Sequence, residues 1–141
     1  MELQAEEIMH LHVKIAKALE VGASPEGYLR VIPIVGGEFE GALFRGTILS
    51  GGADWNMEVN SHYSHVHAVY CIQENDGTII SVDNSGYIDF TENRFIRTVP
   101  HFTVHSDDKK YEVLQTGVFV GALDASRSEE GFIEICLYKL A

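Results

Sequence analysis

Apolar and polar residues alternate along most of this chain, which is the pattern of β-strands that bury one face. The clearest run spans residues 62–73. Every second side chain from Tyr63 to Cys71 shares one face of this strand, and those from His62 to Ile72 share the other. Both faces carry apolar side chains, so we expect both to be covered or to line an interior.

Turn signals separate the strand-like runs at intervals of about 8 to 12 residues. Residues 74–77 end in Asp-Gly, which supplies the positive φ angles of a tight hairpin. Residues 24–27, Ser-Pro-Glu-Gly, mark another turn, and the charged segment 106–110 predicts a solvated one. Residues 84–86, Asn-Ser-Gly, predict a further turn or a bulge.

The two ends of the chain give different signals. Residues 6–22 fit a helical stripe and a period of two almost equally, so the pattern leaves helix and strand open. Residues 111–123 and 131–140 predict a closing pair of strands joined by a polar loop. No helix is expected after Gly22, which argues against an α/β fold.

A glycine-rich stretch, GGEFEGALFRGTILSGGADW, spans residues 36–55 and alternates glycines with apolar residues. Glycine within a strand marks a bulge, a sharp bend or a close approach of another backbone. We therefore predict a bent hairpin in a closed sheet. Its end delivers Asp54 and Trp55, the only tryptophan of the chain, together.

These patterns predict an all-β fold, with residues 1–141 forming a single antiparallel β-barrel of roughly eight to ten strands, calycin-like or similar. Closure removes the exposed edges that a small open sheet has to protect. Barrels of this size can hold one small ligand. A small-molecule ligand is therefore the expected partner.

Composition narrows the partners further. The net charge of −11 repels phosphate backbones and anionic lipid surfaces, so neither nucleic acid nor membrane is an expected partner. The chain starts without the basic segment and apolar run of a secretory signal, and we expect a cytoplasmic protein. Cys71 and Cys136 lie in separate apolar runs without a CxxC spacing, which favours buried, reduced thiols.

The order GGxFxGxxxxGxxxxGGADW at residues 36–55, followed by ENDGTIISVDNSG at 74–86, resembles the proteins grouped as domain-of-unknown-function family 3237. The segments EVG, VIPIVGGEFEG, TVPHF, YEVL and VFVG extend the resemblance over nearly the whole chain. The resemblance implies a compact antiparallel β-barrel that often self-associates and has no established general activity. It also favours a strand at the N-terminus.

The chain departs from this family at two places. Asn60-Ser61 stands where members usually have an Asp-Gly turn with a nearby arginine. His67 and Val69 stand where many members have an acidic residue and an arginine. If that charged pair has a role in relatives, this protein cannot fill it in the same way, and its histidines point to a different ligand.

Asp54, His65 and His67 are the candidate catalytic residues. An aspartate that orients an imidazole sets its tautomer and raises its basicity, which is the ordinary construction of a general acid/base near neutral pH. The alternative is that Asp54 caps the adjacent glycine turn and the histidines lie on a solvated face.

Trp55, Arg45, Tyr63 and Phe102 are the candidate ligand-binding residues, because ligand cavities are mainly apolar and aromatic with a few polar groups. For each aromatic residue, the alternative is simple packing in the core. Arg45 is open between an inner position, where it would meet Asp54 or a ligand carboxylate, and a solvated outer one.

Two other functions stay open. A metal-dependent, cupin-like barrel would use the histidines His62, His65, His67, His101 and His105, but no carboxylate or cysteine completes an evident ligand set, so no metal or other cofactor is assigned. Alternatively, the glycine hairpin serves only self-association of a structural protein.

Overall fold

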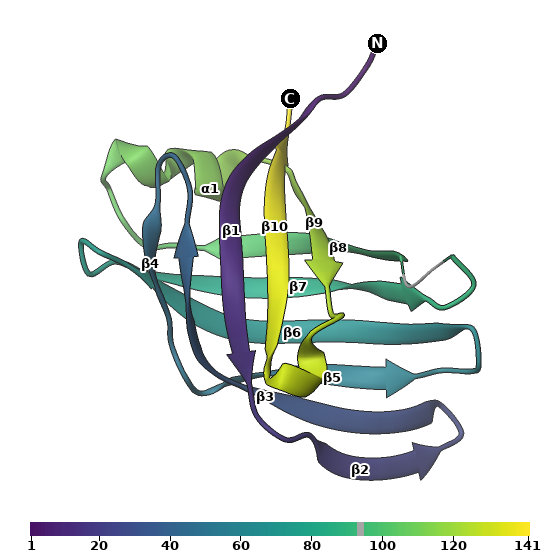
Figure 1. Ribbon diagram of the computed structural model, residues 1–141. Helices are drawn as coiled ribbons and strands as arrows, with labels where there is room; N and C mark the ends of the chain where they lie inside the picture. The colour runs from purple at the N-terminus through teal and green to yellow at the C-terminus, as the bar shows by residue number, and fades with distance from the viewer. Residues whose placement is uncertain (93–94) are drawn as a thin grey trace.

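The computed structural model describes residues 1–92 and 95–141 (Figure 1). Its elements in chain order are β1 (Ala5–Ile15), β2 (Leu19–Ser24), β3 (Gly27–Glu40), β4 (Arg45–Ile48), β5 (Gly52–Glu58), β6 (Tyr63–Glu74), β7 (Ile79–Asp89), β8 (Phe95–Thr103), the 3-10 helix η1 (Lys109–Tyr111), α1 (Glu112–Thr116), β9 (Phe119–Asp124), the 3-10 helix η2 (Ser128–Glu130) and β10 (Phe132–Leu140). Strands make up most of the described chain, as the alternating sequence predicts.

Within the described residues, eight strands form a closed antiparallel barrel (Figure 1). Around the barrel the order is β1-β10-β9-β8-β7-β6-β5-β3, and pairing of β3 with β1 closes the ring. β2 pairs with one end of β3, and β4 lies between β3 and β6 beyond the stretch where β5 pairs with them. The predicted all-β antiparallel barrel is confirmed, and the N-terminal segment is a strand, as the family resemblance implies.

The glycine-rich stretch bends β3 and lets neighbouring strands approach it closely. Gly37 has a φ of +129°, and a Cβ atom there would lie 2.0 Å from the backbone oxygen of His12. On β4, a Cβ atom at Gly46 would lie 1.9 Å from the backbone oxygen of Gln73. Only glycine fits at such distances, so these residues allow the long strand β3 to turn from β5 towards β1.

The core fills one half of the barrel with apolar side chains. Its fully buried members include Met9, Leu11, Ile72, Ile80, Val82 and Leu137, which alternate with outward residues on β1, β6, β7 and β10. η1 and α1 lie at one end of the barrel, beside β4 (Figure 1). There the buried ring of Tyr111 stacks on Phe44 with ring centroids 5.5 Å apart. This end is therefore packed.

Residues 109–116 are helical, and the prediction of a strand from Tyr111 is wrong for this segment. The Asp108 carboxylate accepts a hydrogen bond from the backbone N–H of Lys110 (3.1 Å) and so caps η1. Tyr111 and Leu114 are both buried, and a spacing of three residues places two side chains on one face of a helix but on opposite faces of a strand. A helix this short, with only two buried side chains, contains too few residues to show the helical period of about 3.6 residues, so its sequence resembles that of a strand.

The cysteines are free thiols, as predicted, but they are half-buried rather than buried. Cys71 lies on β6 and Cys136 on β10. In the described part of the chain, no helix is both long enough and apolar enough to span a bilayer.

Candidate functional site

Strand alternation decides which of the predicted site residues face the barrel interior. On β5, Asp54 pairs with Ala68 of β6 on the inner face, and Trp55 pairs with His67 on the outer face. The Trp55 side chain is 45% exposed. Because successive residues of a strand point to opposite faces, Asp54 and Trp55 do not share the pocket that their adjacency in sequence suggests.

The candidate residues of β6 also lie outside the barrel. His67 Nε2 is 2.9 Å from Oδ1 of Asp83 on β7, and the His65 ring packs edge-on against Tyr87 with centroids 5.0 Å apart. Tyr63 is 43% exposed. These side chains form a polar and aromatic outer surface, separated from the interior by the sheet.

Arg45 and Phe102 occupy two further environments. Arg45 is exposed on β4 and lines a groove on the outside of the barrel together with His10 and His12. Of the two positions predicted for Arg45, the structure therefore shows the solvated outer one. Phe102 is partly buried and packs edge-on against Phe119 with ring centroids 5.0 Å apart, as part of the core.

A cavity of about 40 Å³, which we call the chamber, lies inside the barrel. Apolar side chains form most of its wall, and four polar ones interrupt them. The lining residues are Val13, Ile15, Ile32, Ile34, Asp54, Val66, Ala68, Tyr70, Asn84, Thr98, Leu123, Ile133 and Ile135. A cavity of this size holds the polar end of a small molecule or a very few waters.

A wider space of about 240 Å³, which we call the mouth, shares much of its wall with the chamber. Asp54, Val66 and Leu123 are among the residues that line both spaces. Arg30 and Glu58 line only the mouth and give it a charged rim. The mouth and chamber together form a path into the barrel, with the Asp54 carboxyl group where the two meet.

The environment of Asp54 shifts the pKa of its carboxyl group. Burial raises the pKa of this carboxyl group above its ordinary value, and hydrogen bonds from the backbone N–H of His67 and from the Asn56 side chain offset part of that effect. The His67 N–H donates to Asp54 Oδ1 at 2.9 Å. Asp54 therefore contacts the backbone of this histidine, and the expected pairing of the carboxylate with an imidazole ring is not formed.

Three buried polar atoms on the chamber wall have no hydrogen-bond partner among the described residues: the Tyr70 hydroxyl, Asn84 Oδ1 and Thr98 Oγ1. The three residues are only 2–3% exposed. Burial raises the pKa of Tyr70, so its hydroxyl stays protonated at physiological pH and can donate a hydrogen bond. The chamber thus presents both a donor and an acceptor to whatever enters it.

The sequence patterns did not single out these three residues. Residues 84–86 were expected to form a turn or bulge, but they continue the strand β7, so that prediction is wrong. The signal available in the sequence was strand alternation, since Ile80, Val82 and Asn84 are spaced two apart and fall on one face of a single long run. A polar residue at an inward position of a buried strand is a candidate ligand contact.

The histidines considered as metal ligands do not gather. His65 and His67 lie on the outer face of β6, while His62, His101 and His105 are exposed. In the described part of the chain, the group of three potential ligands that does come together contains none of these five. They give the metal-dependent alternative no support.

Fold and site together define a small, closed antiparallel β-barrel with an internal chamber. The sequence model of the family described as "Protein of unknown function (DUF3237)" matches residues 3–140. The chain therefore belongs to this family, as its glycine pattern indicated.

Several similar proteins match this chain over almost its whole length. A UPF0311 protein from Clostridium acetobutylicum is 27% identical over 156 residues, which cover 99% of this chain and 96% of the relative. A crystal structure of a β-barrel-like protein from Acinetobacter baumannii has 25% identity and a TM-score of 0.86, covering 100% of this chain and 98% of that one. An enzyme from Penicillium herquei is 20% identical with a TM-score of 0.79, covering 100% and 96%, and this likeness shows the fold alone.

Proposed function

We propose that the barrel binds a small, mainly apolar or aromatic organic molecule, with the polar end of the ligand in the chamber and its body in the mouth, and that Asp54 transfers a proton to or from it. The observation that carries this proposal is the set of three unpartnered polar atoms on the wall of one cavity. Leaving a buried polar group unpaired costs about 1–3 kcal/mol, so three of them at one place favour a ligand that pairs with them.

The polar groups also define what the ligand offers. Asn84 Oδ1 accepts a hydrogen bond, so it suits a hydroxyl or amine on the ligand, while the neutral Tyr70 hydroxyl can donate to a carbonyl oxygen. The surrounding isoleucine, valine and leucine side chains favour an apolar skeleton. A phenol combines these features through its hydroxyl, and an enolisable ketone combines them in its enol form.

Asp54 is the group on this wall that can exchange protons. Its raised pKa brings a carboxyl group closer to neutral pH, where general acid/base catalysis by a carboxyl group is most effective. The Tyr70 hydroxyl, donating a hydrogen bond to a ketone oxygen, would stabilise the enolate that forms when the ionised carboxylate of Asp54 takes the α-proton. The structurally similar protein from Penicillium herquei is described as an enzyme, which is consistent with chemistry in this fold.

Binding is tested with 2-naphthol and 2-tetralone as neutral probes, followed by ligand-observed and amide NMR. We expect shifts of amides on β5, β6 and β7, and a loss of affinity of about tenfold, or 1.4 kcal/mol, in Ala68→Leu, which fills the chamber. Val69→Leu adds volume on the outer face and serves as the matched control. No binding of either probe, or equal binding by Ala68→Leu, would contradict a ligand in the chamber.

The proton-transfer step is tested separately by deuterium exchange at the α-carbon of 2-tetralone in D₂O. We expect the protein to accelerate exchange and Asp54→Asn to abolish the acceleration while probe binding persists. If both proteins exchange the proton equally, Asp54 is a binding residue only.

Self-association, which the family resemblance implies, is a second proposal. The outer face of β5–β8 exposes large apolar side chains, among them Trp55, Val69, Tyr87 and Val99 at 38–57% exposure. Large apolar side chains exposed on one face of a sheet favour a protein–protein contact. Sedimentation velocity of the wild-type protein and of Trp55→Lys tests this: an oligomer that the substitution weakens supports it, and a monomer at high concentration contradicts it.

A further inference from the structure

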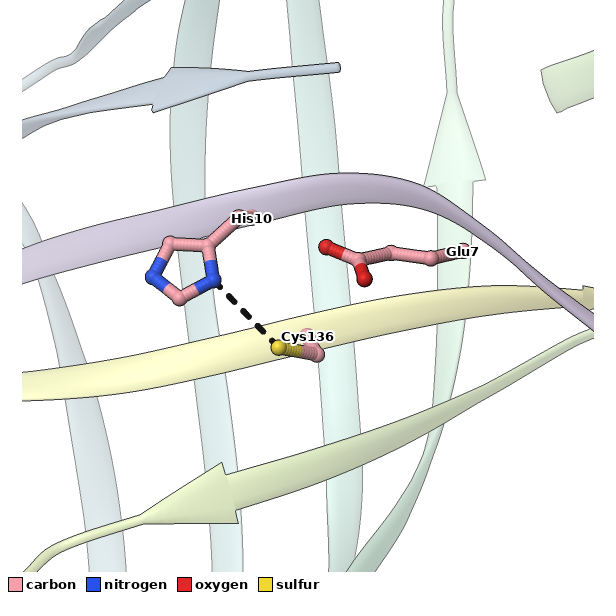
Figure 2. Close-up of side chains that lie close together, drawn as sticks. All are labelled: Glu7, His10 and Cys136. Atoms are coloured by element: carbon pink, nitrogen blue, oxygen red, sulfur yellow. Dashed lines mark hydrogen bonds between the residues drawn. The ribbon is translucent and has the colours of Figure 1, made fainter. Parts of the chain in front are cut away.

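A group of three potential metal ligands lies on the outside of the barrel, on the wall formed by β1 and β10. Figure 2 shows Glu7 and His10 on β1 with Cys136 beside them on β10. Of the described residues, these have a carboxylate oxygen, an imidazole nitrogen and a sulfur atom all within 4.8 Å of one another. Met9 and Leu11, the neighbours of His10, are fully buried in the core, so the group faces away from the chamber.

A β-bulge brings the three residues together. Residues three apart in a regular strand point to opposite faces, and Glu7 and His10 would then be separated by the sheet. The register of β1 against β10 shifts between Glu7 and Met9, which inserts one extra residue and turns both side chains outward. Cys136 is the direct cross-strand partner of His10. The bulge therefore adds the carboxylate to a histidine–cysteine pair.

The two ring nitrogens of His10 have different partners. Nδ1 lies 3.3 Å from Cys136 Sγ (Figure 2), and Nε2 contacts a carboxylate oxygen of Glu134. Glu134 is also held by His12, whose Nδ1 lies 2.5 Å from its other carboxylate oxygen. A carboxylate on one ring nitrogen fixes the proton there and leaves the lone pair on the other, which is the usual arrangement behind a metal-bound histidine.

We propose that Glu7, His10 and Cys136 bind a zinc ion, with Glu134 orienting His10 from behind. A thiolate, an imidazole and a carboxylate together suit zinc, whereas Mg²⁺ and Ca²⁺ prefer oxygen ligands alone. Zinc–ligand distances of about 2.0–2.3 Å place tetrahedral N and S ligands about 3.5 Å apart, close to the 3.3 Å between His10 Nδ1 and Cys136 Sγ. Glu7 is exposed, so its side chain can move onto the metal.

Three protein ligands leave a fourth position of the zinc open to solvent or to a further ligand. His10 also lines the outer groove, a space of about 490 Å³ whose wall includes Glu38, Glu40 and Glu134. The side chain of His10 is 42% exposed, so a metal ion reaches it without opening the barrel. These acidic side chains would also raise the local concentration of cations.

The experiment uses untagged, chelator-washed protein titrated with Zn²⁺ against a fluorescent chelator. We expect one zinc per chain and a loss of affinity of more than about 100-fold in Cys136→Ser and in His10→Ala, since each loses a direct ligand. Cys71→Ser, which removes the other half-buried thiol, and His67→Ala, which removes an outer-face imidazole, are the matched controls and should bind zinc like the wild type. Equal affinity of all five proteins would overturn the site.

Cobalt substitution gives a readout that does not depend on any variant. Co²⁺ bound by Cys136 should show a thiolate-to-cobalt charge-transfer band in the wild-type protein, and its absence at saturating Co²⁺ would overturn the proposal. Glu134→Gln should keep that band but weaken zinc binding by about 10–100-fold, as loss of an outer-shell carboxylate does. An unchanged zinc affinity in Glu134→Gln would show that Glu134 does not orient His10 for metal binding.

Discussion

Replacing Tyr70 by phenylalanine isolates one polar atom of the chamber. The Tyr70 side chain is 3% exposed, and its hydroxyl has no hydrogen-bond partner among the described residues. Phenylalanine keeps the ring in place and removes only this oxygen. If the hydroxyl is held for a ligand rather than for stability, the variant should be more stable than the wild type.

The magnitude follows from the burial of the hydroxyl. An unpaired buried hydroxyl costs about 1–3 kcal/mol, and the lower end applies because a chamber of about 40 Å³ has room for solvent beside it. We therefore expect Tyr70→Phe to raise the free energy of unfolding by about 1 kcal/mol. For a chain of 141 residues, this corresponds to a rise in Tm of about 3–4 °C.

Urea unfolding monitored by far-UV circular dichroism is the appropriate assay. Trp55 is 45% exposed in the folded protein, so its fluorescence changes little on unfolding. We expect a higher midpoint with an unchanged m-value, because the surface exposed on unfolding stays the same. Tyr87→Phe, at a residue 57% exposed on the outer face, is the matched control and should change stability by less than about 0.5 kcal/mol.

A decrease in the stability of Tyr70→Phe by more than about 0.5 kcal/mol would refute the reasoning, since the hydroxyl would then be paired and stabilising. Binding of 2-naphthol or 2-tetralone provides the second half of the test. The more stable variant should bind these probes less tightly, because one of their hydrogen-bond partners is gone. A gain in stability without loss of binding would separate the hydroxyl from the ligand.

Three further variants test other parts of the structure. Because the pKa of Asp54 is raised in the folded state, its neutral form stabilises the fold below the pKa of the unfolded chain, and this stability is lost as pH rises through the folded pKa. The free energy of unfolding of the wild type, relative to Asp54→Asn, should therefore fall by about 1.4 kcal/mol per unit of pKa difference between the two states. Urea unfolding from pH 4 upwards measures this fall. Gly46→Ala should destabilise the fold by more than about 2 kcal/mol, measured by thermal unfolding, because its Cβ atom would lie 1.9 Å from the backbone oxygen of Gln73. Gly36→Ala, whose Cβ atom would lie 3.9 Å from the nearest atom, is the control and should be tolerated. Leu114→Ala should cost about 2–5 kcal/mol in urea unfolding by leaving a cavity under α1, and a smaller effect would show that α1 does not anchor this end.

The barrel was predictable from features that act locally. The alternating run at residues 62–73 is β6, and the Asp-Gly turn that follows has its glycine at a φ of +96°. Three glycines of residues 36–55, Gly37, Gly41 and Gly46, mark a close approach of strands because a Cβ atom at each would lie 1.9–2.0 Å from a backbone oxygen of a neighbouring strand. Local turn chemistry and strand period were therefore sufficient for the fold class.

The site was harder to predict because it depends on which face of each strand turns inward. Asp54 was predicted to work with Trp55, His65 and His67, yet the register of β5 and β6 places it alone on the inner face. A period of two defines two faces and does not say which one is inside when both are partly apolar. Asn84 was missed for a related reason, since Asn-Ser-Gly is typical of a turn and only its cross-strand pairing makes it part of a wall.

Cross-strand register also explains why Asp54 and Asn84 lie at one level of the barrel. Asp54 is the partner of Ala68, and Ala68 is the partner of Asn84, so the three residues form one layer across β5, β6 and β7. Cross-strand partners have Cβ atoms about 4.5–5.5 Å apart, and the small alanine leaves a gap between the carboxyl and the amide groups. Tyr70 lies two residues from this layer on one side, along β6, and Thr98 lies two residues from it on the other side, along β8, and both line the chamber. A ligand bound beside this layer would have its polar atoms in the chamber of about 40 Å³ and its apolar body in the mouth of about 240 Å³. This orientation brings the polar atoms of the ligand to the polar side chains of the chamber wall.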